Sequence, residues 1–186
     1  NKNVRSRLMG IPTLISTATP SGVSSIAITS GIGSTYDEYM FVFTDINISY
    51  NGSQLMLAGS TDGGSNYGVD KTTTMFWTTN SESGSSDFGY QTGHDLAQSD
   101  AVQPLSYQVG NGANESLAGI LHLYSPSNTT YVTHYTAQMH FHTLNDQARN
   151  WFTAGYFNTT SAVNAVRFNT VQGDIDSGNI QLFGIA

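Results

Sequence analysis

The run YDEYMFVFTDINI at residues 36–48 is the densest stretch of strand-forming residues in the chain. Side chains of a strand alternate between its two faces, and aromatic and β-branched residues favour that pleated geometry. One face of the run carries three aromatic residues: Tyr39, Phe41 and Phe43. The opposite face is also mostly apolar and carries four residues: Met40, Val42, Thr44 and Ile46. The pattern therefore predicts a central strand whose second face is covered as well.

Two interpretations of that cover remain open. A loop or another element of the same chain would make the run an ordinary core strand, which is the simpler interpretation. Another subunit would make the second face an oligomer interface, with Met40 and Val42 among its contacts.

The rest of the chain repeats short apolar runs separated by turn residues, and no stretch carries apolar residues at helical spacing. An extended piece is expected at residues 13–19, and further strands are expected at 23–29, 54–60, 71–79, 88–90, 102–109, 116–124, 131–143, 151–158, 163–171 and 179–185. About ten short strands predict an all-β protein, namely an antiparallel β-sandwich of jelly-roll-like arrangement. We expect residues 1–10 to form an N-terminal arm and residues 11–186 to form one domain.

Three connections carry specific expectations. Asn51-Gly52 is a strong hairpin signal and predicts that the strand at 54–60 returns along the central strand. Pro104 cannot donate a backbone hydrogen bond, so its strand is expected at a sheet edge. The polar segment 144–150 is expected to hold one helical turn.

Composition limits the partners of this protein. Charged residues make up 10% of the 186 residues and the net charge is −7, with only six Lys and Arg. No basic face can be built from so few cations, which argues against nucleic acid as a partner. No apolar run approaches the roughly 18 residues that span a bilayer. The chain has no cysteine, so thiolate chemistry and disulfides are excluded.

Three histidines share one face of the predicted strand at 131–143: His134, His140 and His142. The His140-x-His142 pair resembles the His-x-His of cupin-type barrels, in which two imidazoles face one metal ion. Asp146 stands where that family has a glutamate, and the flanking glycines are missing. His134 lies about 20 Å further along the strand and is instead a candidate interface residue.

Two turns could offer oxygen atoms to Ca²⁺, and two tyrosines could stack on sugars. Asp62 with Asn66 forms one such turn, and Asp174 with Asp176 forms the other; Asx-turns explain both sequences equally well. Tyr67 and Tyr90 lie near Gly-rich loops and are candidate sugar-binding residues. The candidate binding loops cover residues 62–67, 81–90 and 110–114.

No catalytic arrangement emerges from the motifs. The chain has no G-x-S-x-G sequence, and two of its three glutamates, Glu82 and Glu115, fall in predicted loops. We therefore expect a protein that is not an enzyme.

Four segments together resemble a family of small β-sandwich proteins from tailed phages, especially marine ones. They are SGVSSIAITSGIGSTYDEYMFVFTDI, AGSTDGGSNY, AGYFNTTSAVNAVRF and GDIDSGNIQLFGI, at residues 21–46, 58–67, 154–168 and 173–185. The resemblance implies a virion structural component, in a tail fibre or other appendage or decorating the capsid. It implies identical subunits and capsid or tail proteins as partners, and host-surface glycan as a further partner.

We therefore expect a non-enzymatic virion surface protein that assembles with copies of itself. The first alternative is a free carbohydrate-binding module, and the second is a cupin-like metal enzyme that uses His140 and His142. A neutral polar surface suits assembly, because few ions must be desolvated when copies pack together.

Overall fold

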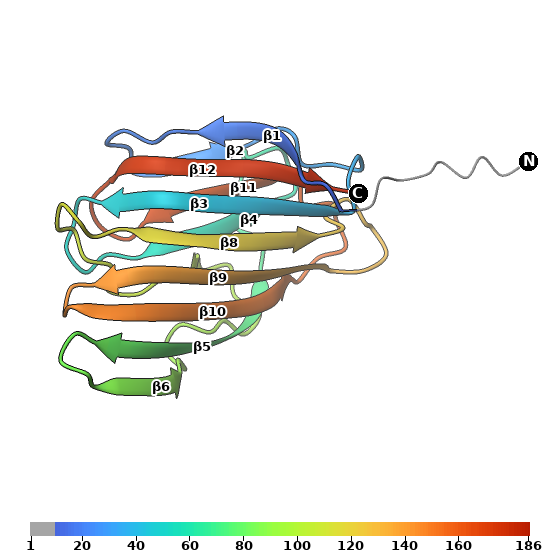
Figure 1. The fold of residues 1–186 in the computed structure, drawn as a ribbon. Coiled ribbons are helices and arrows are strands. Elements are labelled where there is room, and N and C mark those ends of the chain that lie inside the picture. The colour runs from blue at the N-terminus through green and yellow to red at the C-terminus, as the bar shows by residue number, and fades with distance from the viewer. Residues whose placement is uncertain (1–9) are drawn as a thin grey trace, which may run out of the picture.

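The computed structural model describes residues 10–186, which form twelve strands in two antiparallel sheets (Figure 1). The predicted arm at residues 1–10 lies outside the described residues except for Gly10. The strands are β1 (Thr13–Ala18), β2 (Ser25–Ile28), β3 (Glu38–Ile48), β4 (Leu55–Ser60), β5 (Lys71–Ser81), β6 (Ser86–Tyr90), β7 (Gln103–Pro104), β8 (Leu117–Tyr124), β9 (Thr133–Thr143), β10 (Gln147–Phe157), β11 (Ala165–Thr170) and β12 (Ile175–Ile185). The all-β prediction is confirmed, with twelve strands where about ten were expected.

The strand order is that of a jelly roll with two added hairpins. The larger sheet has the order β1-β12-β3-β8-β9-β10-β5-β6, and the smaller sheet has the order β2-β11-β4-β7. Without the hairpins β5–β6 and β9–β10, eight strands remain in two four-stranded sheets, which is the double Greek-key arrangement of a jelly roll. Both hairpins join the same edge of the larger sheet, beyond β8, and extend it to eight strands (Figure 1).

The core lies between the two sheets. The inner face of β3 contributes Tyr39, Phe41 and Phe43, as the alternation predicts, and all three are buried. The Phe168 ring on β11 meets those of Phe41 and Phe43 edge-on, with ring centroids 5.4 Å and 5.0 Å apart. These contacts couple the smaller sheet to the larger one.

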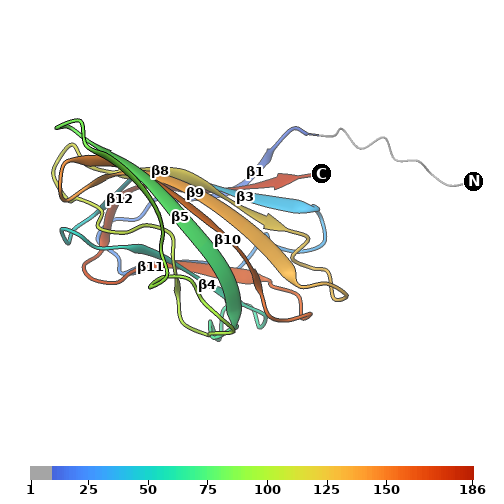
Figure 2. The ribbon, with the colours of Figure 1, turned by 90° about the horizontal axis from the view of Figure 1, so that it is seen from below.

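The hairpin extension reaches beyond the smaller sheet, and the connection at residues 91–116, which includes the edge strand β7, covers its inner face. Backbone hydrogen bonds tie this connection to β5, including the N–H of Thr73 to the carbonyl of Leu96 at 2.9 Å. Tyr107 packs against the buried Trp151 ring of β10, with centroids 6.0 Å apart. Figure 2 shows this connection on the same side of the larger sheet as β4 and β11.

The structure corrects the predicted position of Ile46. Asp45 has a φ of +53°, and the pairing register of β3 shifts between Phe43 and Ile46 on its β8 side. This β-bulge reverses the alternation, because one extra residue turns the following side chains to the opposite face. Ile46 is consequently buried in the core, whereas Met40 and Val42 stay on the outer face.

Two predicted connections are also wrong, and one is confirmed. The Asn51-Gly52 turn does not close a hairpin, since β3 belongs to the larger sheet and β4 to the smaller one. The expected helical turn at 144–150 does not form, because β9 and β10 pair from Thr143↔Gln147 onwards and leave only three residues for the turn. Pro104 does lie on an edge strand, β7 of the smaller sheet.

Candidate functional site

The outer face of the eight-stranded sheet carries an apolar row across its middle. Figure 1 looks onto this face, and the smaller sheet lies behind it; none of residues 10–186 forms a second layer over it (Figure 2). The strand registers align one row of outer side chains across six strands, from β3 to β6: Val42, Ile120, Gln138, Phe152, Phe76 and Tyr90. Five of the six are apolar or aromatic, which is unusual for a solvent-facing row.

The centre of this surface holds large exposed side chains around a depression. Ile120 is 39% exposed and Phe76 is 40% exposed. The Phe76 and Phe152 rings stack with centroids 4.6 Å apart. Ile120, Phe76 and Phe152 line a depression of about 290 Å³ on the outer face. His122 also lines this depression. Gln138 interrupts the row between Ile120 and Phe152. Exposed apolar side chains gathered in this way mark interaction sites.

All three predicted interface residues lie on this face. Met40 pairs across strands with His122, and Val42 pairs with Ile120. His134 is exposed and its ring meets that of Tyr156 at 5.7 Å. Tyr90 also belongs here as the neighbour of Phe76, and its hydroxyl donates to Asp95 at 2.8 Å.

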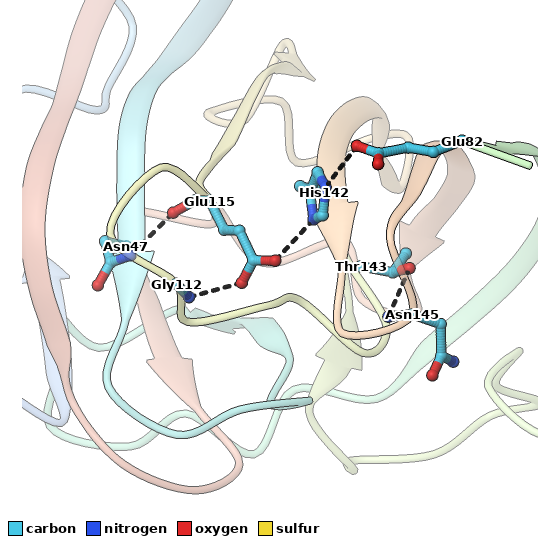
Figure 3. Close-up of polar contacts among 7 residues, drawn as sticks. All are labelled: Asn47, Glu82, Gly112, Glu115, His142, Thr143 and Asn145. Carbon is cyan, nitrogen blue, oxygen red and sulfur yellow. Dashed lines mark hydrogen bonds and ion pairs between the residues drawn. The ribbon is translucent and has the colours of Figure 1, made fainter.

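A second site gathers polar side chains at one end of the same sheet (Figure 3). His142 lies near the end of β9, and its Nδ1 is 2.9 Å from Oε1 of Glu115, a residue of the connection before β8. The Nε2 atom of His142 is 3.7 Å from Oε1 of Glu82 in the β5–β6 turn. Asp146, in the β9–β10 turn, completes a group in which one donor atom each of Glu115, His142 and Asp146 lies within 4.8 Å of the others.

Short hydrogen bonds hold the Glu115 side of this site in place. Oε2 of Glu115 accepts from the backbone N–H of Gly112 at 2.5 Å. The side-chain amide of Asn47 donates to the Glu115 carbonyl at 2.8 Å. The Nδ1 atom of His142 is buried and makes no hydrogen bond, although it is close to the Glu115 carboxylate. Its contact with Glu115 therefore has the distance of an ion pair without hydrogen-bond geometry.

His140 and His142 share the outer face of β9, as the alternation predicts. Both rings line an open groove of about 520 Å³ on the outer face of the sheet. His140 contacts Gln138, with 3.3 Å between their Nε2 atoms, and is not part of the group around His142. On the inner face of β9, the neighbouring residues Met139 and Phe141 belong to the core.

The turn after β4 satisfies its own polar groups. The Asp62 carboxylate accepts from the Ser60 hydroxyl at 2.7 Å and from both the backbone and the side-chain nitrogens of Asn66 at 2.9 and 2.6 Å. These bonds, with the Asn66 side chain first, lower the pKa of Asp62 to about 2. The Arg167 guanidinium covers the ring of Tyr67 at 4.5 Å. The turn thus has the internal bonding of an Asx-turn.

The two remaining candidate metal ligands lie elsewhere. Asp174 precedes β12 and Asp176 is its second residue. Asp176 is exposed, and in the part of the chain that the structure describes neither residue belongs to a cluster of three His, Asp or Glu donors.

Sequence reasoning missed most of the partners at both sites. Phe76 and Phe152 each interrupt an otherwise regular alternation with an aromatic residue on the solvent side, and that signal is readable in the sequence. Glu82 and Glu115 carry no such signal, because only the folded sheet brings their loops to His142.

These features define a jelly-roll β-sandwich with an uncovered apolar sheet face and a cluster of one histidine and several carboxylates at its end. No helix among the described residues is long and apolar enough to cross a membrane. No family model matches the chain, and no curated protein gives a significant match. A solved structure of infectious bursal disease virus, Gx strain, matches with a TM-score of 0.20 and 9% identity, over 95% of this chain and 40% of that chain. A similarity of that size carries no weight for fold or function.

Proposed function

We propose that the protein is a non-enzymatic structural subunit that assembles with copies of itself through the outer face of the eight-stranded sheet. The observation that carries this proposal is the apolar row from Val42 to Tyr90, which no part of residues 10–186 covers. A second copy is the occupant that best suits this face, because an isologous contact pairs an apolar patch with itself.

The whole outer face, with the apolar row across its middle and polar side chains on both sides of it, has the size of a stable contact. Eight strands about 4.8 Å apart and about six residues at roughly 3.3 Å rise give a face of ~750 Å². A stable protein interface buries about 800 Å² on each partner. The low charge of the chain favours assembly, because few ionised groups must be desolvated when two copies come into contact.

A location on the surface of a phage virion, in a tail fibre, an appendage or a capsid decoration, is the finer part of the proposal. It is supported by the resemblance of residues 21–46, 58–67, 154–168 and 173–185 to small β-sandwich proteins of tailed phages. A jelly roll is also an architecture used in viral capsids.

Ile120→Asp is expected to convert the assembled protein to a monomer. Ile120 lies near the middle of the face, so each copy would bury an unpaired carboxylate at a cost of about 3 kcal/mol, which weakens association at least about a hundredfold. Sedimentation velocity at high micromolar concentration measures the effect. Val171→Asp, another exposed aliphatic residue that lies outside this face, is the matched control and should assemble like the wild type.

A wild-type chain that sediments as a monomer would overturn the assembly proposal. So would an Ile120→Asp variant that keeps its circular dichroism spectrum and assembles as before. An assembly seen only with capsid or tail proteins would place a different partner on the face and would also count against self-association.

Attachment to a glycan is a second candidate function, favoured by one hollow at the opposite end of β9 from His142. Tyr131 is 70% exposed there and lines a depression of about 560 Å³ together with Tyr124 and Asn128. Aromatic rings beside polar groups suit sugars. A sugar ring has an apolar face that stacks on an aromatic ring, and hydroxyl groups at its edge that form hydrogen bonds.

Tyr131→Ala is expected to weaken glycan binding about fivefold, since one stacked ring contributes about 1 kcal/mol. A glycan array followed by titration of the best ligand measures this. Tyr50→Ala removes a similarly exposed ring from the β3–β4 turn and should leave binding unchanged. Equal losses in both variants, or no bound glycan, would exclude this hollow as the site.

A further inference from the structure

We propose that Glu115, His142 and Asp146 form a binding site for a divalent transition-metal ion of the zinc type. Their donor atoms lie within 4.8 Å of one another, and Glu82 approaches the same imidazole at 3.7 Å. The site is independent of the assembly function, since it depends on none of the residues in the apolar row.

The donor set matches the chemistry of zinc. Zinc binds His nitrogen and carboxylate oxygen at about 2.0–2.2 Å, which places tetrahedral donors roughly 3.4 Å apart. Oε1 of Glu115 and Nδ1 of His142 are 2.9 Å apart, somewhat closer than that separation, so the two side chains would move slightly apart around an ion. Asp146 is exposed, and one of its carboxylate oxygens lies within 4.8 Å of the donor atoms of Glu115 and His142. Calcium prefers all-oxygen sites, so an imidazole among the donors favours zinc over calcium.

Unmatched negative charge at this site points to a cation. Three carboxylates surround one imidazole, and no Lys or Arg of residues 10–186 forms an ion pair with Glu82, Glu115 or Asp146. The guanidinium of Arg149, two strand positions from the β9–β10 turn, instead contacts Gln147 and the ring of Trp77. The buried Nδ1 of His142 makes no hydrogen bond, and imidazole nitrogens are common metal ligands.

The surrounding backbone holds the donors in register before any ion arrives. The N–H of Gly110 donates to the carbonyl of His142 at 3.0 Å, which ties the Glu115 connection to β9. The N–H of Glu82 donates to the carbonyl of Asp146 at 3.1 Å, which ties the β5–β6 turn to the β9–β10 turn. A bound ion would therefore link the connection before β8 to the end of β9 and the β9–β10 turn. Glu82 lies on the other side of the His142 ring from Glu115 (Figure 3) and would add negative charge near the ion without binding it.

Titration of the full chain with ZnCl₂ by isothermal calorimetry tests the proposal. The wild type should bind one Zn²⁺ per chain, its melting temperature should rise by about 5 °C at saturating metal, and EDTA should reverse the rise. His142→Ala should weaken binding at least about a hundredfold. Glu115→Gln and Asp146→Asn keep the shape of each side chain and should each weaken it at least about tenfold.

His140→Ala is the matched control, because His140 lies two residues away on the same strand and face but outside the group. It should bind Zn²⁺ like the wild type. Equal losses for His140→Ala and His142→Ala would indicate non-specific surface histidines and would overturn the site. No stoichiometric binding by the wild type, or Ca²⁺ binding in place of Zn²⁺, would overturn it as well. If His142→Ala fails to fold, the two shape-preserving variants decide the matter.

Discussion

Replacing Phe168 with alanine is expected to lower the free energy of unfolding by about 4 kcal/mol. The Phe168 ring is fully buried and is the edge-on partner of both Phe41 and Phe43. Truncating a buried phenylalanine costs about 3–5 kcal/mol, since transfer energy is lost and a cavity remains. The substitution removes a contact between the two sheets and leaves a cavity beside the rings of Phe41 and Phe43.

Urea unfolding monitored by tryptophan fluorescence measures the change. Phe88→Ala is the matched control, because Phe88 is 67% exposed on β6 and its removal should cost less than about 1 kcal/mol in the monomer. Both variants should be compared at concentrations at which the chain is monomeric. Equal destabilisation by the two substitutions would mean that the sheets are not joined through Phe168.

Replacing Lys71 with methionine is expected to raise the free energy of unfolding by about 2 kcal/mol at pH 7. Lys71 is fully buried at the start of β5, and its ammonium donates to the Val69 carbonyl at 2.7 Å. Burial lowers the pKa of Lys71 from 10.5 to about 8, against the opposing effect of the Asp100 and Asp70 carboxylates. A difference of that size costs the folded state about 3 kcal/mol while the ammonium stays charged. Methionine removes that cost and loses one hydrogen bond worth about 1 kcal/mol.

The difference in unfolding free energy between the wild type and Lys71→Met should depend on pH in a defined direction. Between pH 8 and pH 10.5 the unfolded chain holds the Lys71 proton and the folded chain releases it, so the wild type gains stability as pH rises. The advantage of the Lys71→Met variant should therefore shrink through this window and disappear above it. Urea unfolding of both proteins at pH 7, 8.5 and 10 measures the difference. An advantage that stays constant with pH would show that Lys71 is not the titrating group.

Local alternation predicted much of this fold. The inner aromatic residues of β3 and the outer position of Met40 and Val42 follow directly from a two-residue period. The same reasoning placed Ile46 on the wrong face, because nothing in the sequence announces that Asp45 adopts a positive φ. A bulge is set by how β3 must bend to pair with both β8 and β12, and those strands lie far away in sequence.

The sites show the same division. His142 was identifiable from its place beside His140 in a strand, and Asp146 from its spacing after it. Glu82 and Glu115 could not be assigned to His142, since they reach it from the β5–β6 turn and from the connection before β8. That meeting depends on β5 and β8 lying on either side of the β9–β10 hairpin, which is a property of strand order.

The sequence by itself determined that the chain is an all-β sandwich, poor in charge, with one strand that is apolar on both faces. The tertiary structure alone decided that β3 and β4 lie in different sheets despite the Asn51-Gly52 signal, and that two hairpins widen one sheet into an uncovered apolar face. The physical reason is the distance along the sequence over which each interaction acts. Side-chain alternation and turn chemistry act over a few residues, whereas strand order is selected by how well distant apolar faces bury one another.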